Sequence, residues 1–188
     1  NINGAVAVSS GLSALRLGML ALGIKENDKV IIPAYSCVAL VNAVLSIRAI
    51  PVAVDIDLQT YNISLKETKK LIDNDVKAII LVNTFGLPSV ADGFKKLGLK
   101  IIEDFSHGFE FKNHNNKWGG VIKGDIAISS FYSTKLISGG EGGIVLSDND
   151  ETIQFIKKLR DYTDKIPDGS RLNDKMTDIE AGLVLSQT

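Results

Sequence analysis

The chain has 188 residues, enough for one well-buried domain and too few for two large ones. Its 45% hydrophobic and 23% charged residues and its formal net charge of −1 are typical of an ordinary soluble globular protein. Because Lys and Arg are scattered along the chain, we expect neither nucleic-acid nor membrane binding. The longest apolar runs, such as AIILV at 78–82, are also far shorter than a membrane span.

Short apolar runs alternate with amphipathic stretches along the chain. We predict strands at 29–33, 51–56, 78–83, 100–104, 126–131 and 143–147, and helices at 10–23, 64–74, 89–98 and 149–162. Gly23 marks a C-cap, and Ser64 with Glu67 has the spacing of a capping box. Most strands are continuous apolar runs, as expected when both faces of a sheet are covered. The pattern predicts an α/β fold with three αβα layers and a mainly parallel sheet.

The end of the chain departs from this alternation. The strands at 126–131 and 143–147 enclose no helical pattern, so we expect an antiparallel pair around the loop that contains Lys135. Residues 164–176 read as a linker. The sequence starts without methionine and ends in LSQT, which reads as mid-helix, so we expect a fragment or a processed form. Cys37 is the single cysteine, which excludes an intrachain disulfide and fits a reducing cytoplasm.

Ligands of such sheets bind beyond the carboxyl ends of the strands. That rule selects the residues that follow the predicted strands, which are 33–37, 83–86, 104–107 and 129–135. Asp104 could be a base, a metal ligand, a counter-ion to a ring nitrogen or an N-cap. A metal would need further ligands beside His107, and His114 lies in the hydrophilic KNHNNK loop, so we expect no metal site.

Two further features admit more than one interpretation. Ser9, Ser10 and Gly11 begin a predicted helix, where free N–H groups favour an anion such as phosphate but where serine is also a common N-cap. Neither a G-x-G-x-x-G nor a P-loop motif is present. Lys135 could be a surface residue or an amine that forms a Schiff base with a carbonyl compound.

The surroundings of Lys135 favour the second interpretation. Ser130, Ser133 and Thr134 supply hydroxyl groups that suit a phosphate, and the following glycines would let the chain approach a ligand closely. An amine, a strand-end carboxylate and a helix start with hydroxyls are what the aldehyde, the pyridine nitrogen and the phosphate of pyridoxal 5′-phosphate require. The three features together predict that cofactor.

The sequence resembles the large domain of the DegT/StrS-type sugar aminotransferases, which are fold-type I pyridoxal phosphate enzymes. The resemblance covers nearly the whole chain, so 1–188 is expected to be one cofactor-binding large domain, with a small C-terminal domain missing. Its most specific block is SFYSTKLISGGEGG, and matching segments in family order include SSGLSALRLGMLALGI, LKIIEDFSHGFE and KMTDIEAGLVLSQ.

The resemblance implies a role for individual residues. Lys135 would form the Schiff base and then shuttle protons, and Asp104 would pair with the pyridinium nitrogen. His107 stands where the family often has glutamine, near the ring oxygen of the cofactor. Ser130 and the backbone of Leu12 and Ser13 would hold the phosphate, at a helix start whose Ser10 and Gly11 also belong to the cofactor site. Asn173 would reach across a dimer interface to the partner's phosphate.

The sequence also departs from the family pattern at the cofactor site. Leu12 replaces the threonine of the usual S-G-T, so one phosphate hydroxyl is lost while the backbone N–H groups remain. Cys37 falls where an aromatic side chain commonly stacks on the pyridine ring. Tyr35, two residues earlier, is the substitute that we expect to stack.

The implied function is transfer of an amino group to a nucleotide-linked keto-sugar, with glutamate as the donor and a homodimer as the working form. Two alternatives stay open. A sugar dehydratase of the same fold lacks the Schiff-base lysine, so Lys135 argues against it. A catalytically incomplete binding or regulatory module is supported by the chain length, since family members are about twice as long.

Overall fold

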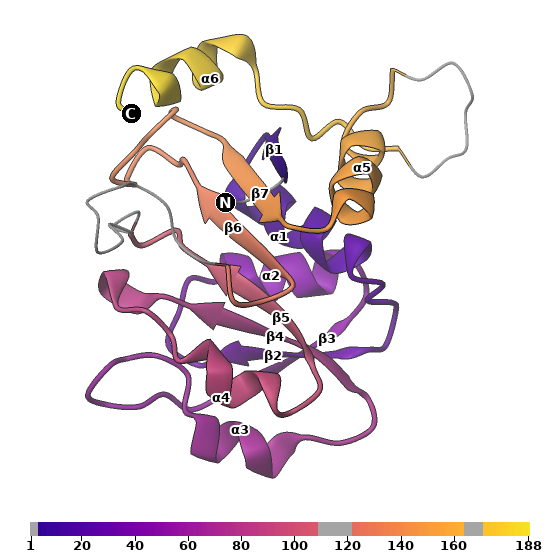
Figure 1. Cartoon of the computed structure of the whole chain (residues 1–188), viewed down its shortest axis with the longest axis vertical. Helices are drawn as coiled ribbons and strands as arrows, with labels where there is room; N and C mark the ends of the chain where they lie inside the picture. The colour runs from indigo at the N-terminus through magenta and orange to yellow at the C-terminus, as the bar shows by residue number, and fades with distance from the viewer. Residues whose placement is uncertain (1–3, 109–121, 164–170) are drawn as a thin grey trace.

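The fold is built on one mixed β-sheet (Figure 1). The structure is a computed structural model that describes residues 4–108, 122–163 and 171–188. In the described residues the sheet has seven strands in the order β1-β7-β6-β5-β4-β2-β3. They are β1 (Gly4–Val8), β2 (Lys29–Pro33), β3 (Ile50–Val54), β4 (Val76–Val82), β5 (Lys100–Asp104), β6 (Ile126–Ser130) and β7 (Gly143–Ser147). β7 runs antiparallel to both of its neighbours, and every other pairing is parallel.

Helices cover both faces of this sheet. One core cluster joins α1 (Gly11–Ala21), α2 (Ala39–Ser46) and α5 (Asp150–Leu159) to residues such as Val30 and Ile32 of β2. The other joins α4 (Ala91–Lys95) and the start of α3 (Leu65–Leu71) to Ile31 and its neighbours. Because successive strand residues point to opposite faces, both faces of the strands must be apolar. The predicted α/β fold with three αβα layers and a mainly parallel sheet is confirmed.

Several elements differ from the expectations. β1 and α2 were not predicted, whereas the antiparallel pair of β6 and β7 around the lysine loop is confirmed. Ser64 caps α3 through the N–H of Glu67, but the Glu67 carboxylate pairs with Lys70 and does not complete a capping box. Part of the predicted linker, 164–170, and His114 lie outside the described residues.

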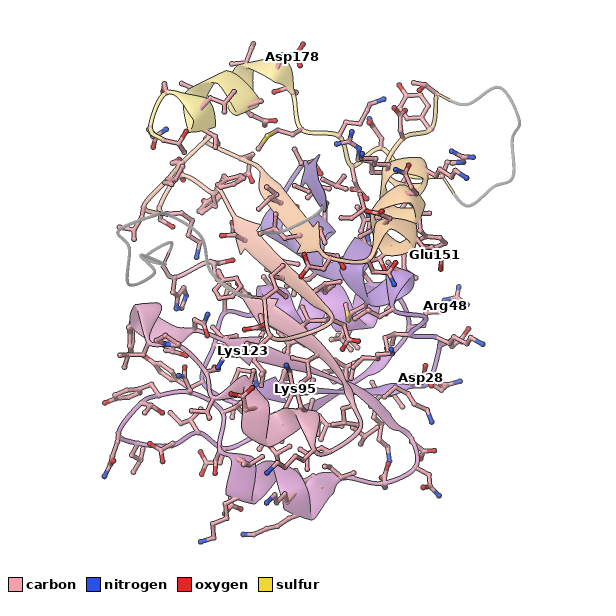
Figure 2. All side chains as sticks on the ribbon, viewed as in Figure 1. Asp28, Arg48, Lys95, Lys123, Glu151 and Asp178 are labelled. Atoms are coloured by element: carbon pink, nitrogen blue, oxygen red, sulfur yellow. The ribbon has the colours of Figure 1, made fainter. Side chains whose placement is uncertain are left out.

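Charged side chains of both signs are spread around the outside of the molecule (Figure 2). Labelled examples are Asp28, Arg48, Lys95, Lys123, Glu151 and Asp178. In the part of the chain that the structure describes, no helix is long and apolar enough to cross a lipid bilayer.

One edge of the sheet collects the segments that matter for a site. β1, β5 and β6 end there, and β7 starts there, since Ser130 pairs with Gly143 and Val8 also pairs with Gly143. Helix α1 begins at the same edge immediately after β1, with Ser10 as its N-cap. A short 3₁₀ turn (Thr84–Gly86) follows β4, and α6 (Asp178–Leu185) lies beside the β6–β7 connection.

Candidate active site

A pocket of about 330 Å³ opens at this carboxyl edge. Its size lies at the lower end of the range typical of small-molecule sites. Its lining combines the start of α1, the ends of β5 and β6, the lysine loop and the segment after β2. The predicted site residues among its walls are Ser10, Gly11, Leu12, Cys37, Asp104, His107, Ser130 and Lys135.

Asp104 ends β5 and is 4% exposed. Burial raises the pKa of its carboxyl group, because desolvation disfavours the charged form. The opposing influences that lower this pKa are hydrogen bonds from Ser106 and the charges of His107 and Lys135. The backbone N–H of Ser106 donates to Asp104 Oδ1 at 2.8 Å. Asp104 is therefore a poorly solvated carboxylate, fixed in position by Ser106, that could pair with a cationic ring nitrogen.

His107 follows Asp104 by three residues and stacks on the aromatic ring of Phe85. The two rings are stacked with centroids 6.2 Å apart, and the backbone N–H of Phe85 donates to His107 Nδ1 at 3.4 Å. Because Nδ1 accepts this bond, we assign the imidazole proton to Nε2. Burial, and then the charge of Lys135, lower the pKa of His107. The side chain therefore favours the neutral form.

Lys135 lies in the connection between β6 and β7 and lines the pocket with a half-buried side chain. Its backbone N–H donates to the carbonyl of Tyr132 at 2.8 Å, which holds the loop in a turn. Its positive charge acts on the pKa of both Asp104 and His107, so the three groups form one electrostatic cluster.

The start of α1 forms one wall of the pocket. The Ser10 hydroxyl accepts the N–H of Ser13 at 3.0 Å, and the Ser10 carbonyl accepts that of Ala14 at 2.9 Å. Gly11 and Leu12 lie in the first turn, where a helix offers no backbone acceptor to their N–H groups. A Cβ atom on Gly11 would lie 2.7 Å from Ser130 Cβ, so glycine lets the helix start approach the end of β6.

The glycines after Lys135 let the lysine loop pack closely against other segments of the chain. A Cβ atom on Gly143 would lie 2.5 Å from the carbonyl oxygen of Ser10, and one on Gly142 would lie 2.2 Å from the methyl group of Met176. Gly142 also has φ +130°, which other residues rarely adopt. These two glycines let the lysine loop approach the start of α1 and segment 171–177. From the sequence we expected them to let the loop approach a ligand.

Three predicted residues lie outside the pocket lining. Ser13 is buried, and its hydroxyl donates to Asp174 at 2.9 Å. Tyr35 packs with Tyr61 and Phe85, at centroid distances of 5.8 and 6.4 Å. Asn173 is exposed in segment 171–177.

Sequence reasoning missed several wall residues. Ser106 connects two strand ends, since its N–H donates to Asp104 and its Oγ accepts the N–H of Ser130 at 3.0 Å. The Asp-x-Ser spacing after a strand is a recognisable turn signal for it. Tyr132 and Glu141 also line the pocket, and neither carries a local signal that distinguishes it from a surface residue.

The donor set fits pyridoxal phosphate. A buried carboxylate, a lysine amine and a helix start with a closely packed glycine occupy one cavity, as its ring nitrogen, aldehyde and phosphate require. Within the described residues, no group of three or more His, Cys, Asp or Glu side chains could hold a metal ion.

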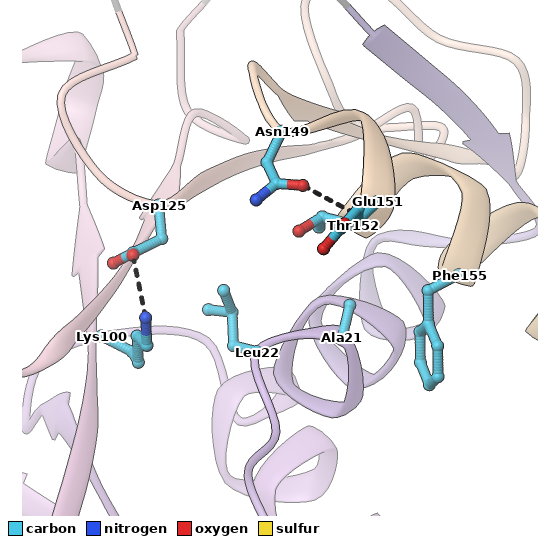
Figure 3. A pocket seen from close by; sticks show the side chains of 8 residues that line it. All are labelled: Ala21, Leu22, Lys100, Asp125, Asn149, Glu151, Thr152 and Phe155. Carbon is cyan, nitrogen blue, oxygen red and sulfur yellow. Dashed lines mark hydrogen bonds and ion pairs between the residues drawn. The ribbon is translucent and has the colours of Figure 1, made fainter.

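A second pocket of about 400 Å³ lies at the opposite, amino edge of the sheet (Figure 3). Its polar groups bind one another: Lys100 pairs with Asp125 at 3.5 Å, and Asn149 accepts the N–H of Thr152 at 3.1 Å as the N-cap of α5. The pocket at the carboxyl edge is the better candidate, because it alone of the two contains an amine beside a buried carboxylate.

Comparison with known proteins gives concordant results. Residues 2–188 match the DegT/DnrJ/EryC1/StrS aminotransferase family. GDP-perosamine synthase of Escherichia coli O157:H7 is 39% identical over 153 residues, which cover 79% of this chain and 41% of the synthase. DesV of S. venezuelae superimposes with a TM-score of 0.88 and 27% identity, covering 100% of this chain and 52% of DesV.

A third relative has been solved with its cofactor. NtdA of Bacillus subtilis, with bound cofactor PMP, superimposes with a TM-score of 0.84 and 28% identity, covering 99% of this chain and 44% of NtdA. The chain therefore spans about half the length of the proteins that it matches.

Proposed function

The chain belongs to the DegT/DnrJ/EryC1/StrS aminotransferase family, and on that premise we propose that it is the cofactor-binding large domain, 1–188, of a pyridoxal phosphate-dependent sugar aminotransferase. The amino acceptor is a nucleotide-linked keto-sugar and the donor is glutamate. The enzyme works as a cytoplasmic homodimer. The observation that carries the proposal is the single pocket that unites Lys135, Asp104 and the start of α1.

Each residue of the pocket has a task in this proposal. Gly11, Leu12 and Ser130 would hold the phosphate, and Asp104 would keep the pyridine nitrogen protonated. Nε2–H of His107 would be the donor for the ring oxygen. The cofactor, when bound, supplies an electron-withdrawing ring that stabilises negative charge on the substrate carbon. The Lys135 amine would hold the cofactor and would also serve as the base that moves the proton at the substrate carbon.

The acceptor class is supported by a relative whose name specifies a GDP-linked amino sugar. The exposed aromatic side chains of Tyr35, Tyr61 and Phe85 contact one another, and Phe85 stacks on His107 of the pocket wall, which supports a substrate that extends beyond the pocket. Lys135 distinguishes this function from the dehydratase alternative, which works without a Schiff-base lysine.

Two half-reactions test the proposal. Protein loaded with pyridoxal phosphate is mixed first with glutamate, and its absorption spectrum is followed together with the appearance of 2-oxoglutarate. A GDP-linked keto-sugar is then added, and amino-sugar formation is measured. We expect one equivalent of 2-oxoglutarate per site. A protein that binds the cofactor but releases no 2-oxoglutarate from glutamate would contradict the donor assignment, and one that binds no cofactor would contradict the function.

A further inference from the structure

Asp174 connects segment 171–177 to the start of α1, although 158 residues separate it from Arg16 along the chain. Asp174 is buried, with its side chain 8% exposed. Oδ1 accepts the hydroxyl of Ser13 at 2.9 Å, and Oδ2 accepts the guanidinium of Arg16 at 2.6 Å. Its backbone carbonyl accepts the N–H of Ser9 at 2.7 Å. The Arg16 side chain is 25% exposed, and among the described residues its Nε atom has no partner, so the ion pair with Asp174 compensates its partial burial.

The segment that carries Asp174 is itself held by the end of α5. The N–H of Leu172 donates to the carbonyl of Leu159 at 2.8 Å, and the N–H of Asp174 donates to that of Arg160 at 2.9 Å. These carbonyls belong to the last turn, where a helix leaves its acceptors without internal partners. Asp174 therefore joins α5 to the amino end of α1.

The carboxylate also fixes hydroxyl groups at the pocket wall. Because a carboxylate only accepts hydrogen bonds, the Ser13 hydroxyl must donate to it. The Ser13 oxygen is then left to accept the hydroxyl of Ser10, at 3.1 Å, while Ser10 Oγ accepts the N–H of Ser13. This chain of bonds, from Asp174 through Ser13 to Ser10, sets the side-chain rotamer of a residue that lines the pocket.

We propose that Asp174 is a positioning residue that fixes the amino end of α1 in the geometry that binds the cofactor's phosphate. This inference rests on the proposed function and adds a residue without a place in the pocket lining. Asp174 acts through Ser13, Ser10 and the backbone of Ser9, and it does not touch the ligand.

Asp174→Asn separates a positioning role from a purely electrostatic role, because the two roles predict opposite changes in the affinity for pyridoxal phosphate. An amide replaces one acceptor oxygen with an NH2 donor, which either faces the guanidinium of Arg16 or reverses the bond to Ser13, so the start of α1 loosens. If Asp174 acted only through its charge, its removal would leave an unopposed cation near the phosphate and tighten binding. We expect roughly tenfold weaker binding of pyridoxal phosphate, about 1.4 kcal/mol. Pyridoxal, which lacks the phosphate, should change less than about twofold.

Two further variants complete the design. The double variant Asp174→Asn, Arg16→Gln leaves the net charge of the pair unchanged and leaves no cation unpaired. It therefore tests only the positioning of α1, and it keeps the proposal testable if Asp174→Asn alone misfolds. We expect the same phosphate-selective loss. Asp161→Asn is the control, because Asp161 pairs with Lys175 at 2.9 Å in the same region without contacting α1, and both affinities should be unchanged.

Dissociation constants are measured by absorption titration of the full protein with each compound. Unchanged or tighter binding of pyridoxal phosphate by both Asp174 variants, or an equal loss for pyridoxal, would overturn the proposal. If wild-type protein binds neither compound, the proposed function fails, and amide exchange at Ser9 decides the inference separately. That amide should exchange much faster in Asp174→Asn than in Asp161→Asn, and equal exchange rates would contradict the inference.

Discussion

Asp104 and His107 show how burial prepares single side chains for chemistry. Desolvation is the largest cause of both shifts, since it raises the pKa of Asp104 and lowers the pKa of His107. The charge of Lys135 opposes the shift of Asp104 and adds to the shift of His107. Such opposed shifts within one cavity are typical of functional sites. They also have consequences for the stability of the protein without its cofactor.

Asp104→Asn should make the cofactor-free protein more stable at neutral pH while abolishing transamination. The folded-state pKa of Asp104 lies above the ordinary value of 3.8, so its ionised form costs stability at neutral pH, and this cost falls as pH drops through the folded pKa. Asparagine keeps an acceptor for the N–H of Ser106 and carries no charge. Thermal unfolding from pH 4 to pH 8 measures the difference, and a lower melting temperature for the variant at pH 7 would contradict this account.

His107 should make stability decrease as the solution is acidified. Its folded pKa lies below the ordinary value of 6.5, so the unfolded chain takes up a proton first as pH falls below that value. Stability is then lost between pH 6.5 and the folded pKa. Urea unfolding of wild type and His107→Gln across this range should show a steeper pH dependence for wild type. Parallel curves would refute the assignment of a neutral imidazole.

The glycines of the lysine loop illustrate how elements are brought together. Gly143→Ala would place a methyl group against the Ser10 carbonyl, which is backbone and cannot rotate away. We expect a loss of about 1–3 kcal/mol in the free energy of unfolding, with weakened cofactor binding. Gly182→Ala is the matched control, because α6 leaves open space there, and it should gain about 0.5–1 kcal/mol. Chemical denaturation of both variants measures the contrast, and equal effects would contradict the packing account.

Sequence patterns predicted the elements with strong local signals. The predicted strands 29–33, 100–104 and 143–147 coincide with β2, β5 and β7, because their apolar runs are bounded by charged or glycine residues. β1 is a short run of small residues, and α2 has no side-chain cap at Val38 and little polar periodicity, so neither stood out. The rule that ligands bind beyond the carboxyl ends of the strands also selected Asp104 and Lys135. Asp174 could not be found this way, because its partners are more than 150 residues away along the chain.

At the scale of the whole molecule, large apolar side chains remain exposed around the lysine loop and α6. Ile179 is 79% and Leu185 72% exposed, and none of the residues of α6 is buried. Leu136, in the lysine loop, is also exposed. These exposed apolar side chains support the proposed homodimer, because exposed apolar surface on this scale is typical of an interaction site.

Ile179→Glu should therefore shift the protein from dimer to monomer. A charge at an apolar interface would be desolvated without a partner, which weakens association by several kcal/mol on the order of what an unpaired buried charge costs. Phe155→Glu, on α5 at the opposite edge of the sheet, is the matched control and should leave the dimer intact. Sedimentation velocity distinguishes the species. A dimer that persists in Ile179→Glu would place the interface elsewhere.

The proposal that Lys135 holds pyridoxal phosphate is tested most directly by mapping the lysine to which the cofactor becomes attached. Wild type, Lys135→Ala and Lys100→Ala are each incubated with the cofactor, reduced with borohydride, digested and mapped by mass spectrometry. Lys100 is the control because it lies in the pocket at the amino edge of the sheet. We predict one reduced adduct, on Lys135, in wild type and Lys100→Ala, and none in Lys135→Ala. Adducts distributed over surface lysines, and unchanged in Lys135→Ala, would contradict the account.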